Sequence, residues 1–85
     1  IQVPAKIRNR LQKDLLINGV DTKIHYPIPL HLQECSNNLG YVKGDFPVSE
    51  NLANSMISLP IYPLLEDKEI DYIASKFNIL IDKYL

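Results

Sequence analysis

Near the start of the chain, an apolar side chain recurs at every fourth residue and charged residues lie between these positions. The apolar positions are Val3, Ile7, Leu11 and Leu15. This spacing places the side chains on one face of a helix. Pro4 suits the first turn of such a helix, and Gly19 suits the residue just past its end. The pattern predicts an amphipathic helix over residues 4–18, with the basic residues between the apolar positions, including Arg8, on its solvated side.

Beyond Gly19 the period changes from about four to two. Residues 20–26 alternate between the two faces of an extended segment, which is typical of a short strand that stops at Pro27. A second apolar run begins at Met56 and predicts another short strand that leads to Pro60. Two strands alone make a poor sheet. We therefore expect a further strand before Ile1, and the chain to be a piece of a larger protein.

Three more helices are expected. Pro29 can open a short helix through about residue 35, and Pro47 a second one through residue 55. The last helix is the clearest, because acidic residues from Glu66 precede a long apolar stripe. The stripe consists of Ile70, Ile73, Ala74, Phe77, Ile81 and Tyr84. The resulting order predicts an α/β, or layered α+β, fold with helices packed on a short sheet.

Composition limits the partners and the cellular compartment that can be expected for this chain. Eighty-five residues suffice for one small domain, and a net charge of −1 gives no reason to expect a nucleic acid or an anionic membrane as partner. Cys35 is the only cysteine and cannot form an internal disulfide, which fits a reducing compartment. No apolar run reaches the length that spans a membrane. These features predict a cytoplasmic protein.

Residues 24–33 hold the densest group of candidate functional side chains. Two prolines stiffen this segment and push the residue before each of them toward an extended conformation. His25 and Tyr26 can donate hydrogen bonds to a polar ligand such as a sugar or a phosphate, and His31 can do the same or bond to a backbone carbonyl. The alternative from the residues alone is that Tyr26 is core and His25 bonds to backbone. No residue spacing predicts a metal site. Cys35 is not expected to act as a nucleophile, because a lone cysteine usually serves as a small apolar residue.

The same segment belongs to a set of four blocks that resembles a known family. The blocks are GVDTKIHYPIPLHLQ at residues 19–33, LGY at 39–41, GDFP at 44–47 and ISLPIYP at 57–63. In order and spacing they resemble the C-terminal end of the DegT/DnrJ/EryC1/StrS sugar aminotransferases. The resemblance covers nearly the whole chain.

This resemblance implies an enzyme that uses pyridoxal phosphate to move an amino group, usually from glutamate, onto the keto group of a nucleotide-linked sugar. Such enzymes have a fold like aspartate aminotransferase, with a large cofactor-binding domain, a small C-terminal domain and an active site at a homodimer interface. Residues 1–85 would be most of the small domain, without its first strand. No lysine here lies in the family's Schiff-base motif, so the chain alone is expected to be inactive.

The resemblance also changes the interpretation of individual residues. It implies that His25 and Tyr26 lie where the small domain touches the nucleotide-sugar, whereas His31 matches a nearby position of more variable role. Two alternatives stay open. One is a deoxysugar dehydratase of the same fold, in which a histidine replaces the lysine outside this chain. The other is a standalone module that binds a nucleotide-sugar or a protein.

Overall fold

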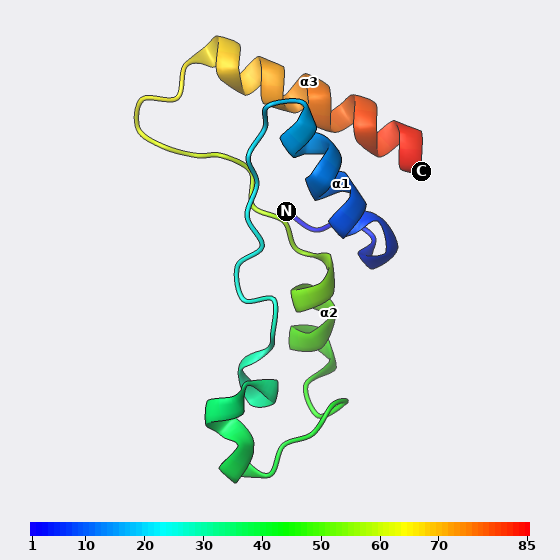
Figure 1. The fold of residues 1–85 in the computed structure, drawn as a ribbon, viewed down its shortest axis with the longest axis vertical. Helices are drawn as coiled ribbons and strands as arrows, with labels where there is room; N and C mark the ends of the chain where they lie inside the picture. Colours follow the sequence, from blue (N-terminus) through cyan, green and yellow to red (C-terminus); the bar gives the residue numbers. More distant parts are fainter.

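The chain forms three α-helices and two short 3-10 helices, with hardly any strand. The computed structural model describes residues 1–85, and its α-helices are α1 (Ala5–Ile17), α2 (Pro47–Ser55) and α3 (Asp67–Tyr84) (Figure 1). The 3-10 helices are η1 (Leu30–Leu32) and η2 (Glu34–Leu39). Thus the predicted helices over residues 4–18 and 47–55, and the long C-terminal helix, are confirmed to within a residue or two.

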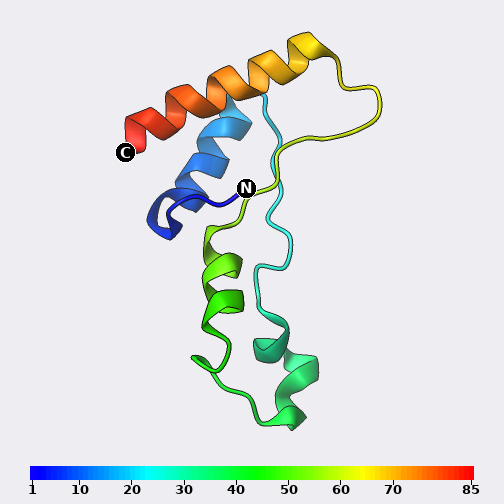
Figure 2. The ribbon, with the colours of Figure 1, turned by 180° about the vertical axis from the view of Figure 1, so that it is seen from behind.

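The core lies where α1 meets α3 and the extended segments beside them. α3 crosses over α1 in both views (Figures 1 and 2), and the apolar stripe of α1 is buried in this contact. The buried apolar side chains are Val3, Ile7, Leu11, Leu15, Val20, Ile57 and Leu80, with Ile73, Phe77, Ile81 and Tyr84 packed against them. The four-residue period of the first segment therefore predicted both the helix and the face that it buries.

The segment over residues 56–58 is the centre of the little strand pairing that exists. Its two antiparallel bridges are Gln2–Met56 and Lys23–Ser58. Neighbouring residues of an extended chain direct their N–H groups to opposite sides, so this segment lies between residues 1–3 and residues 22–24. Each bridge stands alone, and Pro27 and Pro60, which lack an N–H, lie just beyond the paired residues.

The layered α/β sheet predicted from the sequence is therefore not formed. Residues 20–26 and 56–59 form no helix, but they meet at a single bridge and do not build a ladder. Alternating side chains describe only how a strand would use its two faces, whereas a sheet also requires partners along its length. The fold is mostly helical.

The short helix expected over residues 29–35 is also different in the structure. It is divided into η1 and η2 by Gln33, which is extended with φ −72° and ψ 149°. The second part continues to Leu39, and Gly40 ends it with φ 80° in the left-handed region that glycine adopts freely. Because the helix is divided, Cys35 does not share a helical face with His31, and it is exposed.

The molecule is elongated. Its principal extents are 48, 31 and 19 Å, and α1 and α3 lie at one end of the long axis while η1 and η2 lie at the other (Figures 1 and 2). The radius of gyration is 15.4 Å, whereas a compact chain of this length would have about 12 Å. The accessible surface is 6289 Å², against about 5,100 Å² for a compact protein of this mass.

Many large apolar side chains remain exposed as a consequence of this shape. Ile61 and Leu64, in the loop before α3, are 90% and 85% exposed. Val48, at the start of α2, is 73% exposed. None of the helices is both long enough and apolar enough to cross a bilayer.

Candidate functional site

His25 and Tyr26 belong to the segment between α1 and η1. This segment runs from the α1 end of the molecule toward η1 (Figure 1). Both side chains are exposed, Tyr26 to 75%. No backbone or side-chain group from residue 24 to residue 27 makes a hydrogen bond within the chain. The alternative that Tyr26 is a core residue is therefore wrong, and both rings are free to meet a ligand.

Tyr26 has a backbone conformation that the sequence does not predict. Its φ is +54°, and it is the only residue other than glycine with a positive φ. The expectation that Pro27 would hold Tyr26 extended is thus wrong. For a bulky side chain this left-handed conformation costs about 1–2 kcal/mol. Such strain persists only where the surrounding structure requires it, and it is common at functional sites.

His31 lies in a different environment from the other two predicted site residues. It is 9% exposed in η1, and its ring packs edge-on against Phe46 with 4.8 Å between ring centroids. Its Nε2 lies 3.2 Å from the Oε2 of Glu50, a residue of α2. The structure therefore turns His31 inward, while His25 and Tyr26 face solvent.

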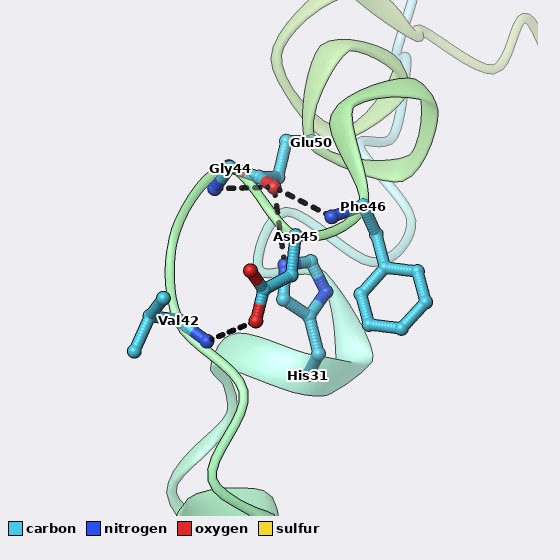
Figure 3. Close-up of polar contacts among 6 residues, drawn as sticks. All are labelled: His31, Val42, Gly44, Asp45, Phe46 and Glu50. Carbon is cyan, nitrogen blue, oxygen red and sulfur yellow. Dashed lines mark hydrogen bonds and ion pairs between the residues drawn. The ribbon is translucent and has the colours of Figure 1, made fainter.

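Glu50 is the centre of a compact polar cluster that also contains His31, Gly44 and Phe46 (Figure 3). Both carboxylate oxygens accept a hydrogen bond from the Gly44 N–H at 2.9 Å, and Oε2 accepts another from the Phe46 N–H at 3.2 Å. The Glu50 side chain is 14% exposed and the His31 side chain 6%. Beside this His31–Glu50 cluster, Asp45 accepts a hydrogen bond from the Val42 N–H at 2.9 Å and tightens the same loop (Figure 3).

These contacts determine the protonation of the Glu50 carboxyl. The Gly44 N–H contributes most to holding the pKa of Glu50 below its ordinary value of 4.5, and the Phe46 N–H and His31 act in the same direction against partial burial. An ionised carboxylate only accepts hydrogen bonds. The Nε2 of His31 must therefore carry the hydrogen that it shares with Glu50.

Sequence reasoning did not single out Glu50. The available signal was an acidic residue at the start of a helix opened by Pro47, where carboxylates commonly bond to free N–H groups at the helix end. That pattern predicts a local cap. It does not reveal that a histidine 19 residues earlier completes the arrangement.

Two cavities lie near the residues described above. One of about 600 Å³ lies between the turn after α1 and the start of α3, and its lining includes Asp21, Tyr62 and Lys68. The other, of about 270 Å³, lies beside the His31–Glu50 cluster and is lined by His31, Leu39 and Phe46 among others. Neither His25 nor Tyr26 lines either cavity.

The chain offers no enclosed site for a cofactor or metal ion. A Schiff-base lysine is enclosed beside the group that it binds, whereas every lysine here is exposed except Lys76, which is half-buried and lies over the Tyr72 ring. The residues present therefore do not form a site for pyridoxal phosphate. No group of three or more His, Cys, Asp and Glu side chains could hold a metal ion.

Comparison with known proteins identifies the same family as the four sequence blocks. Residues 1–78 match the model of the DegT/DnrJ/EryC1/StrS aminotransferase family. The chain is 38% identical over 74 residues to the pleiotropic regulatory protein of Geobacillus stearothermophilus, covering 87% of this chain and 20% of that protein. It is 46% identical over 68 residues to the erythromycin biosynthesis sensory transduction protein EryC1 of Saccharopolyspora erythraea, covering 80% and 19%.

A third relative carries an enzymatic name. The dTDP-3-amino-3,6-dideoxy-alpha-D-galactopyranose transaminase of Aneurinibacillus thermoaerophilus is 33% identical over 76 residues, covering 89% of this chain and 20% of the enzyme. The chain thus spans about a fifth of the length of the curated relatives that it matches. With 78 of its 85 residues matched by the family model, the chain belongs to the DegT/DnrJ/EryC1/StrS aminotransferase family.

Proposed function

We propose that this chain is the small C-terminal domain of a pyridoxal-phosphate-dependent aminotransferase that moves an amino group, from glutamate, to the keto group of a nucleotide-linked sugar. Family membership and the transaminase names of several relatives support this function. The products would be amino sugars for surface polysaccharides such as lipopolysaccharide. The enzyme would act in the cytoplasm, in keeping with the single unpaired Cys35.

The chemistry would be divided between two parts of the protein. A large domain outside these 85 residues would hold the cofactor, and two subunits would meet at the active site. The exposed lysines of this chain support the proposal that it does not catalyse transamination alone. When bound, pyridoxal phosphate supplies the electron sink for the reaction. The small domain contributes by orienting the sugar.

The exposure of the Tyr26 side chain is the observation that supports the proposed contact with the sugar nucleotide. Its phenol is exposed next to the exposed imidazole of His25, on a strained backbone that presents the phenol away from the core. A phenol and an imidazole can donate hydrogen bonds to a sugar hydroxyl or a diphosphate oxygen. Such donors would hold the keto carbon in place for reaction, which is a positioning contribution to the rate.

The test is Tyr26→Phe in the complete protein that carries this chain. Loss of one neutral hydrogen bond is worth about 0.5–1.5 kcal/mol. We therefore expect the KM for the sugar nucleotide to rise about 2- to 13-fold, with the half-reaction with glutamate unchanged. Tyr41→Phe is the matched control, because it removes another exposed phenol that makes no hydrogen bond. A wild-type KM in Tyr26→Phe would contradict the contact.

A further inference from the structure

The stretch that carries His25 and Tyr26 is held only at its two ends. At the upstream end, Lys23 and Ser58 exchange two backbone hydrogen bonds of 3.1 and 2.8 Å. Between Lys23 and Ile28 no group bonds to the rest of the chain, and the Ile28 carbonyl accepts one bond from the Gln33 side chain at 3.1 Å. The position of the two rings therefore depends on where the downstream end is attached.

The His31–Glu50 cluster is that downstream attachment. His31 follows Tyr26 by five residues, and Pro27 and Pro29 lie between them. Because proline fixes φ, this connection is stiff, and a shift of His31 would be transmitted to Tyr26. Glu50 lies on α2 and joins three elements, since it bonds to η1 through His31 and to the loop before α2 through two N–H groups.

The burial of the pair makes this attachment strong. With 6% and 14% of their side chains exposed, His31 and Glu50 have little access to water. Removing one partner of such a pair leaves the other without a substitute for its hydrogen bond, which is costly. The left-handed conformation of Tyr26 also requires that its flanks be held, because a free segment would relax to an ordinary conformation.

We propose that Glu50, acting through His31, is a positioning residue that sets the placement of His25 and Tyr26 for binding of the sugar nucleotide. This inference rests on the proposed function of the two exposed rings. In this arrangement neither Glu50 nor His31 contacts the sugar nucleotide. In this inference His31 bonds to Glu50 inside the protein, whereas the family resemblance leaves open a direct contact between His31 and the substrate.

Four variants of the complete protein test the role of the hydrogen bond. Glu50→Gln keeps the shape of the side chain but loses one acceptor oxygen, and Glu34→Gln is the control at an exposed glutamate without hydrogen bonds. His31→Phe keeps a ring against Phe46 but loses the donor, whereas His31→Gln keeps a donor in place of Nε2. We expect Glu50→Gln and His31→Phe to raise the KM for the sugar nucleotide about 5- to 10-fold, with the KM for glutamate unchanged. Glu34→Gln should match the wild type, and His31→Gln should approach it.

A second readout follows the segment without using activity. Trypsin cleavage after the exposed Lys23 reports how freely residues 24–28 move. We expect cleavage there to be about fivefold faster in Glu50→Gln and His31→Phe than in the wild type and in Glu34→Gln. Unchanged circular dichroism would show that the fold as a whole is retained.

The outcomes separate this inference from the proposed function. If Tyr26→Phe raises the KM but Glu50→Gln changes neither the KM nor the cleavage rate, the positioning role is overturned and the contact stands. If Glu50→Gln speeds cleavage while neither variant changes the KM, the attachment is real but the positioning of a sugar nucleotide is overturned together with the proposed contact. A wild-type KM in His31→Phe together with a raised KM in His31→Gln would assign the effect to ring packing and also overturn the inference.

Discussion

Arg8 illustrates how a single side chain joins elements far apart in the sequence. It is only 7% exposed, and its Nη1 donates to the carbonyls of Ala53 and Met56 at 2.8 and 3.1 Å. These carbonyls lie at the C-terminal end of α2, where the last turn has no intrahelical donors and a cation is favoured. The expectation that Arg8 belongs to the solvated side of its helix is wrong, because α2 packs against that side of α1.

Substitution of Arg8 should therefore destabilise the protein. We expect Arg8→Met, which keeps most of the side-chain length, to lower the free energy of unfolding by about 1–3 kcal/mol, because the buried Ala53 carbonyl loses its donor. Lys6→Met on the exposed side of the same helix should change it by less than about 0.5 kcal/mol. Urea denaturation of the protein that carries this chain measures both values. Equal effects of the two variants would contradict this role.

At the scale of elements, the helices follow from local pattern and the connections do not. The apolar period located α1 and α3, and the prolines located the start of α2. The loop between residue 59 and α3 is secured differently, because the Tyr62 hydroxyl donates to Glu69 Oε2 at 2.8 Å. This bond raises the pKa of Tyr62 above its ordinary value of 10.0, and nearby carboxylate charge adds to the effect.

The Tyr62–Glu69 bond predicts a pH dependence on the alkaline side. A raised pKa in the folded state means that the stabilisation is fully present below pH 10.0 and is lost as the pH rises through the raised value. Ultraviolet titration of tyrosinate should show one phenol that ionises last, and Tyr62→Phe should remove this step. Tyr41→Phe should leave it in place. If the last step survives in Tyr62→Phe, the bond does not form in solution.

At the scale of the whole molecule, the elongated shape leaves too much surface for a compact domain. The accessible area exceeds that of a compact protein of the same mass by about 1,200 Å². Much of the excess is apolar, as at Ile61 and Leu64. Apolar surface on this scale favours association.

The 85-residue chain should accordingly associate as its concentration rises and should bind a hydrophobic dye. Sedimentation velocity and the fluorescence of anilinonaphthalene sulfonate measure the two effects. Replacing both Ile61 and Leu64 with lysine should lower both signals, because these are among the most exposed apolar side chains. Replacing Asn54 and Asn78, which are exposed and polar, with lysine controls for the same added charge. A monomeric chain that binds no dye would contradict the prediction.

The sequence by itself determined the three α-helices, the apolar face of α1 and the family. Each depends on residues close together in the chain: a four-residue period, prolines at helix starts, and four short blocks in a fixed order. It also singled out His25 and Tyr26, whose exposure agrees with the proposed contact. Their role as substrate contacts stays a prediction.

Only the tertiary structure decided the rest, because the decisive partners are distant in sequence. Arg8 meets a carbonyl 45 residues away, and His31 meets Glu50 across 19 residues. The predicted strands failed for the same reason, since a strand's pairing depends on neighbours that its own alternation does not specify. The positive φ of Tyr26 likewise opposes its local preference, because the attachments on either side of the segment govern its conformation.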